Sequence, residues 1–224
     1  LMFWYSTLKS VYPETSAMLG YLQTLSAQPG GKSWAMLFQA RTLLDTESTV
    51  SQGLDQLRAL AAKTRDSGVR YATLRALGGQ LYMRKDAAGA VTAWKQALEL
   101  KQNDGEVENN IAYALATDLN NPEEALQYAE LAAKHEPNNI GVLDTLGAVY
   151  LALDRPKVAV RSSRRTAADA QYMVRLAQAK LRAGDTQGAK DLVAEVEGLL
   201  DRGRKLDDQY TAILDQVRKG LGQG

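Results

Sequence analysis

Apolar side chains recur along this chain with the period of an α-helix. In each periodic segment they return at intervals of three and four residues, and no segment shows the strict alternation of a half-buried strand. The segments that start at 71, 105 and 140 also repeat one another, about 34 residues apart. Each contains two apolar stripes with a polar turn between them. The pattern therefore predicts an all-α chain built from antiparallel helix pairs.

Small and large residues take fixed places in these pairs. Small residues stand where the two helices of a pair must approach closely. They are Gly78, Ala90, Ala97, Ala112, Ala125, Ala132, Gly147 and Ala159. Leu81, Trp94 and Tyr150 are large residues that we expect to fill the remaining space. Pro122 and Pro156 follow the turns, and we expect them to begin second helices, because the N–H that proline lacks is unpaired there anyway.

The segments resemble tetratricopeptide repeats of the bacterial type. The runs Pro122-Glu123-Glu124-Ala125 and Asn138-Asn139 match that pattern closely, and the resemblance covers about 70 to 200. It implies a right-handed superhelical solenoid of antiparallel helix pairs with a C-terminal capping helix.

We expect one superhelical domain with four parts. Residues 1–32 hold an apolar opening and a helix near 14–27, and residues 33–69 form a degenerate helical hairpin. Residues 70–201 hold four repeats, the last weakened by Lys180 at a position where a bulky apolar residue is expected. Residues 202–224 form a capping helix and a tail. The cap is predicted from one apolar stripe, which consists of Leu206, Tyr210, Ile213, Leu214 and Val217.

The amino-acid composition limits the kinds of partner and active site that the chain can have. The 27 basic and 26 acidic residues leave a net charge of +1, so no overall field favours nucleic acid, and we expect no nucleic-acid partner. With no cysteine and a single histidine, thiolate zinc sites and histidine metal clusters are excluded. We expect no catalytic residue, no metal, no cofactor and no enzyme activity. No apolar run is long enough for a membrane span. Cysteine usage leaves the compartment open between the cytoplasm and the bacterial periplasm.

Two local motifs have ordinary explanations. Gly30-Gly31-Lys32-Ser33 resembles the end of a phosphate-binding loop, but Ser26 replaces the first glycine and the residues before it are predicted helical, where that loop follows a strand. We expect a turn instead. His135 stands near the end of a predicted helix without a catalytic constellation, so we expect a surface or capping residue.

Two further segments could meet a partner. The basic run from Arg155 to Arg165 is interpreted as a solvated face rather than an anionic docking patch. The apolar residues Met2 to Tyr5 either pack on the first hairpin or dock into another chain.

The resemblance also implies a site, because in tetratricopeptide solenoids the first helix of each pair lines a concave groove that holds a segment of a partner protein. By register, the groove residues are Arg75, Tyr82, Asn109, Asn110, Tyr113, Asp144 and Gln178. Asparagine amides can bond a peptide backbone through donor and acceptor, and tyrosines supply rigid amphipathic area. A carboxylate clamp known in this family is incomplete here, since Gly79, Gly141 and Thr145 stand at three of its positions.

Two functions remain open at this stage. The first is an adaptor or scaffold whose groove binds a protein or peptide partner. The second is a structural subunit of a larger assembly, and the similarity of residues 109–113 and 142–147 to repeats of bacterial envelope proteins suggests polysaccharide export or secretion.

Overall fold

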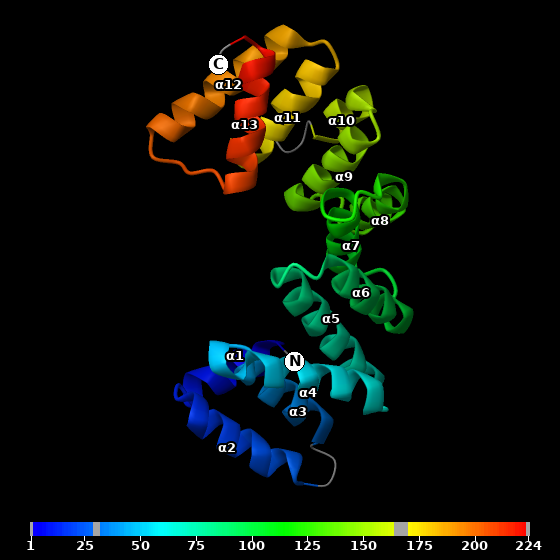
Figure 1. The fold of residues 1–224 in the computed structure, drawn as a ribbon, viewed down its shortest axis with the longest axis vertical. Coiled ribbons are helices and arrows are strands. Elements are labelled where there is room, and N and C mark those ends of the chain that lie inside the picture. The colour runs from blue at the N-terminus through cyan, green and yellow to red at the C-terminus, as the bar shows by residue number, and fades with distance from the viewer. Residues whose placement is uncertain (1, 29–31, 164–169, 223–224) are drawn as a thin grey trace. The chain divides into compact units, whose positions relative to one another are not determined.

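A computed structural model describes residues 2–28, 32–163 and 170–222 (Figure 1). Throughout these ranges the regular structure is helical, with thirteen α-helices, one short 3-10 turn and no strand. This confirms the all-α class. The chain divides into two compact units, Leu1–Gln102 and Asn103–Gly224. The boundary lies inside the segment for which four repeats are predicted, between the first repeat and the second.

Unit 1 contains six helices. They are α1 (Met2–Val11), α2 (Thr15–Ser26), α3 (Lys32–Leu43), α4 (Val50–Lys63), α5 (Ser67–Met83) and α6 (Ala87–Leu100), with the 3-10 turn Glu47–Thr49 before α4. Sequence periodicity anticipates α2 to α6 but not α1. Each of α2 to α6 packs on the helix that follows or precedes it in the chain, most extensively α5 on α6.

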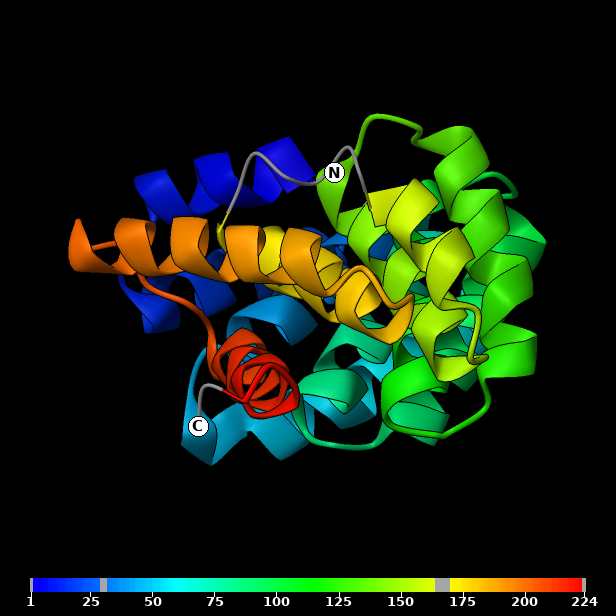
Figure 2. The ribbon, with the colours of Figure 1, turned by 90° about the horizontal axis from the view of Figure 1, so that it is seen from above.

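Unit 2 contains three helix pairs and a final helix. The pairs are α7 (Gly105–Thr117) with α8 (Pro122–His135), α9 (Ile140–Ala152) with α10 (Pro156–Ser163), and α11 (Ala170–Arg182) with α12 (Thr186–Asp201). The final helix is α13 (Asp208–Gly220). Pro122 and Pro156 begin second helices, as predicted. Figure 2 shows the paired helices of this unit side by side, and their contacts bear this out.

Most turns inside the pairs share one construction. In the turns before α6, α8 and α12 the residue before the helix cap has a positive φ, and the cap is an Asp or Asn side chain that accepts a bond from the first turn; before α10 the positive φ falls on Asp154, but Arg155 stands at the cap position. In α6, for example, Lys85 has φ 66°, and Asp86 Oδ1 accepts from the Gly89 N–H at 2.9 Å. Asn120 before Asn121 and Gly184 before Asp185 repeat the arrangement. Each of these three turns thus satisfies an amide that the helix itself leaves unpaired.

Close helix contacts occur at the predicted small residues. Ala90, Ala97, Ala112, Ala125, Ala132 and Ala159 have no exposed surface. A Cβ added to Gly78 on α5 would lie 2.8 Å from Trp94 Cε2 and closer still to two other atoms of that indole ring, which comes from α6. The indole is itself buried, so it occupies the space that the missing side chain leaves.

Candidate functional site

The first helices of the pairs in unit 2, α7, α9 and α11, present side chains to a common side of that unit, here called the first-helix surface. The predicted groove residues of this unit lie on these three helices. They are Asn109, Asn110 and Tyr113 on α7, Asp144 on α9 and Gln178 on α11. Arg75 and Tyr82 lie on α5, in the other unit.

A buried ion pair joins α9 to α11. Arg175 Nε lies 3.0 Å from Asp144 Oδ1 and 3.1 Å from Oδ2, and the two side chains are 9% and 4% exposed. Tyr210 of α13 donates its hydroxyl to Asp144 Oδ2 at 2.8 Å. The Arg175 guanidinium also lies 5.5 Å from the centre of the Tyr210 ring. One tyrosine thus contacts both members of the pair.

Helix α13 contacts all three helices of the first-helix surface. Tyr113 of α7 donates its hydroxyl to Gln209 Oε1, and Gln178 Nε2 of α11 donates to Gln216 Oε1 at 3.4 Å. The Tyr172 ring of α11 packs edge-on against Tyr210, 5.9 Å between centres. Because low-numbered residues of α13 meet low-numbered residues of α11, the two helices run in the same direction. Tyr113, Asp144 and Gln178 are therefore brought together by a helix of the same chain.

Burial controls the protonation of these groups. Burial raises the pKa of Asp144 above 3.8, although Arg175 and the Tyr210 hydroxyl act in the opposite direction. Burial also lowers the pKa of Arg175, but the charge of Asp144 outweighs this and raises it. Burial and the Asp144 carboxylate together raise the pKa of Tyr210, and burial raises that of Tyr113. Both tyrosines are thus neutral hydroxyl donors at physiological pH.

Asn109 has an unsatisfied atom beside this network. Its Oδ1 is buried and accepts no hydrogen bond from any residue that the structure describes. Asn110 and Tyr113 lie one position and one turn further along α7, and all three side chains are partly exposed. A buried acceptor without a donor is unfavourable by about 1–3 kcal/mol. The Asn109 side chain therefore holds a buried acceptor that no described residue satisfies.

Comparison with solved structures identifies the architecture. MamA of Desulfovibrio magneticus RS-1 superimposes with a TM-score of 0.69 at 18% identity, covering 79% of this chain and 98% of that one. A tetratricopeptide repeat protein of Parabacteroides merdae gives 0.71 at 15% identity, covering 85% and 74%. A Podosopora anserina protein with nearly identical TPR-like repeats gives 0.62 at 16% identity, covering 77% and 96%. The chain has the tetratricopeptide-repeat fold. No family model and no curated protein matches the sequence.

In a tetratricopeptide fold the last repeat needs a cap, and α13 supplies it. Its Tyr210, Leu214 and Val217 share an apolar core with residues of α11 and α12, as the predicted stripe requires. Yet α13 packs mainly on α11 and only slightly on α12. Its hydrogen bonds to Tyr113 and Asp144 reach first helices of two earlier tetratricopeptide pairs. The cap therefore also covers part of the first-helix surface.

The predicted residues of unit 1 are differently placed. The Tyr82 ring packs against Trp94, with 5.8 Å between ring centres. The Arg75 guanidinium lies 5.9 Å from the centre of the Tyr71 ring, one turn away on the same helix. Both side chains are half-buried.

His135 has a more specific place than sequence reasoning assigned to it. It ends α8 as expected, but its Nδ1 lies 2.7 Å from Oε2 of Glu108, a side chain of α7 that is only 4% exposed. The histidine is thus the partner of a buried carboxylate. The two are 27 positions apart, and nothing in the repeat pattern announces the pairing.

The remaining candidate motifs do not form a site. Tyr21 to Leu25 lie in α2 and Lys32 begins α3, so a helix precedes the glycine motif as predicted, while Gly30 and Gly31 lie outside the described residues. Ser33 lies in the first turn of α3. Arg164 and Arg165 of the basic run, and the side chains of residues 2–5, also lie outside the described part. No cluster of three or more potential metal ligands occurs among the described residues. None of the helices described could cross a bilayer, since each is too short or too polar.

Proposed function

We propose that this chain is a protein-interaction scaffold that binds a segment of a partner protein on the first-helix surface of unit 2. The observation that carries the proposal is the buried, unpaired Asn109 Oδ1. A peptide N–H would satisfy this acceptor, and Asn110 beside it offers both a donor and an acceptor. The tetratricopeptide fold supports the proposal, because the corresponding surface of such solenoids holds partner segments.

The proposal is tested with a captured partner. The full chain serves as bait, the partner is identified, and its affinity is then measured by calorimetry at fixed salt. We expect Tyr113→Ala to weaken binding by about 1–3 kcal/mol, because interfaces concentrate their energy in a few aromatic or hydrogen-bonding anchors. Asn109→Ala should also weaken it, since the acceptor is lost.

Gln127→Ala provides the matched control. Gln127 is an exposed amide of the second helix α8, away from the first-helix surface, so its removal should leave the affinity unchanged. If Asn109→Ala and Tyr113→Ala bind the partner as tightly as the wild type, the assignment of the site is wrong.

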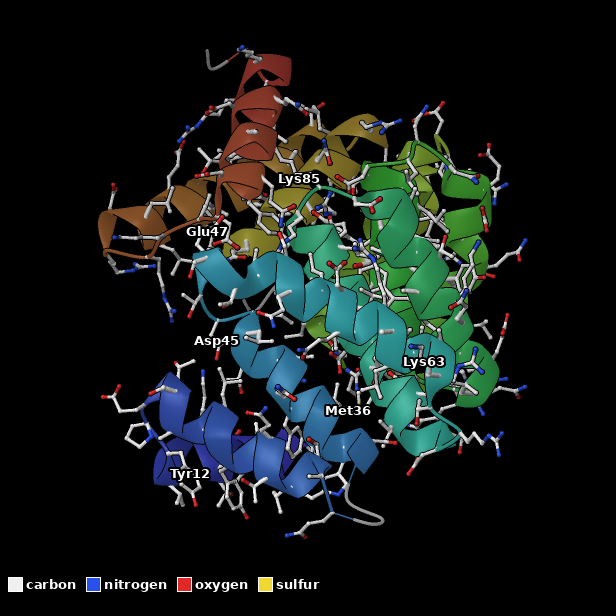
Figure 3. The ribbon with its side chains drawn as sticks, turned by 60° about the horizontal axis from the view of Figure 1, so that its bottom comes forward. Tyr12, Met36, Asp45, Glu47, Lys63 and Lys85 are labelled. Atoms are coloured by element: carbon white, nitrogen blue, oxygen red, sulfur yellow. The ribbon has the colours of Figure 1, made fainter. Side chains whose placement is uncertain are left out.

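A second function, subunit of a larger assembly such as an export or secretion complex, is favoured by apolar exposure in unit 1. Val11 is 63% exposed, and Met36, labelled in Figure 3, is 40% exposed. Tyr12 stacks on the exposed Tyr21 with 4.8 Å between ring centres. Exposed apolar side chains are typical of interaction sites where they form a contiguous patch. A permanent assembly would make Met36→Asp shift the sedimentation coefficient of the native complex, while the Asn109→Ala variant would leave it unchanged.

A further inference from the structure

Helix α13 is attached to the rest of unit 2 by a short, exposed connection. In the segment 202–207 every side chain but Leu206 is exposed, and Gly203 takes a φ of 87°. A partly exposed ion pair, in which Arg218 Nη2 lies 2.9 Å from Glu197 Oε1, links α13 to α12. The Asp207 side chain at the start of α13 makes no capping bond. Apart from this connection, α13 is held by its apolar packing on α11 and α12, by the ion pair with Glu197 and by its contacts with the first-helix surface.

The contacts of α13 have the character of a bound ligand. Its Tyr210, Leu214 and Val217 cover an apolar surface. Its polar side chains form hydrogen bonds with polar side chains of α7, α9 and α11. One of these groups is the Asp144 carboxylate, which is buried in an ion pair with Arg175 and accepts a hydrogen bond from the Tyr210 hydroxyl. Buried ion pairs contribute little stability compared with apolar residues of the same volume. We expect this pair instead to favour partners that can donate a hydrogen bond to Asp144.

We infer that α13 is an exchangeable, internal ligand of the first-helix surface. The partner that replaces it is an amphipathic helix with the same chemistry: a tyrosine that donates to Asp144, followed by apolar residues four and seven positions later, as Leu214 and Val217 follow Tyr210. This rests on the proposed function and names the class of partner. A partner helix of this kind fills the same apolar surface, so the exchange exposes none of it. Because α13 is joined to the rest of the chain, it occupies the surface at the effective concentration that the connection 202–207 sets. A free partner must compete with that effective concentration.

The probe for this exchange is a fluorescein-labelled synthetic peptide with the sequence of residues 207–220. It is titrated into the full chain and followed by anisotropy. In Leu214→Ala the tethered helix is weakened, while α7, α9 and α11 are unchanged. We expect at least tenfold tighter peptide binding to this variant than to the wild type, because the free surface is populated more often.

Two controls and one replacement variant accompany this measurement. Thr211→Ala, at an exposed position of α13, should leave peptide affinity at the wild-type value. A peptide with phenylalanine in place of tyrosine should bind several-fold more weakly to Leu214→Ala, because it cannot donate to Asp144. Tyr210→Phe in the full chain is the milder variant to use if Leu214→Ala loses its helical circular dichroism.

A covalent cross-link that holds α13 on α11 tests the opposite case, in which the helix cannot leave the surface. The chain has no cysteine, so Gln178→Cys with Gln216→Cys introduces one reactive pair at a place where α11 and α13 meet. Bridging the pair with a short bis-maleimide should abolish peptide binding, whereas the single Gln216→Cys variant treated with the same reagent should still bind the peptide, because the surface of α11 is then unmodified.

The outcomes separate this inference from the proposed function. Equal peptide binding by wild-type, Leu214→Ala and cross-linked protein, or none by a folded Leu214→Ala, would show that α13 is a fixed cap and overturn the inference. A dimer that grows with concentration in sedimentation would assign the surface to a second copy, which also overturns it. In either case weakened partner binding by Asn109→Ala would leave the proposed function standing, and its absence would remove that function instead.

Discussion

Two adjacent glycines of α5 allow the packing of a helix pair to be measured directly. Gly78 faces Trp94, and an added Cβ would lie less than 3 Å from three atoms of the indole. Gly79 is the next residue of the same helix, and no atom lies within 4 Å of its added Cβ. Alanine at either position gains about 0.5–1 kcal/mol of helix propensity over glycine. Only the alanine at 78 also overpacks the contact.

The overpacking is not easily relieved. Trp94 is 4% exposed and its ring packs against Tyr82, so it cannot swing into solvent. Inserting a methyl group into such a contact is unfavourable by about 1–3 kcal/mol. We therefore expect Gly79→Ala to raise the free energy of unfolding by up to about 1 kcal/mol. Gly78→Ala should lie about 1–3 kcal/mol below Gly79→Ala, because the propensity terms cancel in this difference.

Urea unfolding followed by circular dichroism gives both values, and the tryptophan emission of the folded state reports whether the indole has moved. The comparison is valid if the two variants share the wild-type dependence on urea concentration. A Gly78→Ala variant as stable as Gly79→Ala would refute the reasoning, since it would mean that α5 and α6 are not in close contact at this residue.

Three further variants test unit 2. Tyr210→Phe should lower its free energy of unfolding by about 1.5–3 kcal/mol, because Asp144 loses a buried hydrogen bond to a charged group; thermal unfolding measures this, and an unchanged midpoint would contradict it. Ala125→Leu should lower stability by roughly 1–3 kcal/mol at a fully buried helix contact; a wild-type midpoint would show that the helices can separate there. The hydrogen bond from the Lys180 ammonium helps hold the pKa of Asp185 below 3.8. The ionised Asp185 carboxylate therefore contributes to stability above pH 3.8, and this contribution is lost as the pH falls through the lowered pKa. Asp185→Asn should flatten this acid limb in a pH series of unfolding curves, and a limb as steep as in the wild type would count against it.

The helix pairs follow from local properties of the sequence. Apolar residues at helical spacing, turns with Asp or Asn caps, and prolines in first turns each act over a few positions, so reading the chain in order finds α2 to α13. The contact of Gly78 with Trp94 could be anticipated in the same way, because the repeat places a small and a large residue at fixed offsets. The capping role of α13 was visible in its apolar stripe.

The candidate site depends on contacts that no local rule describes. Asp144, Arg175 and Tyr210 come from three helices, and the partners of Asp144 lie 31 and 66 positions away. The repeat register shows which residues lie on first helices, but whether they face solvent or another helix depends on where α13 packs. The hint in the sequence of α13 is Tyr210, which stands in the apolar stripe at a position where leucine would also fit and which adds a hydroxyl that needs a buried acceptor. Periodicity thus determined the helix pairs, and tertiary packing alone decided that α13 covers the surface they form, because a helix stripe specifies that it must be buried but not against what.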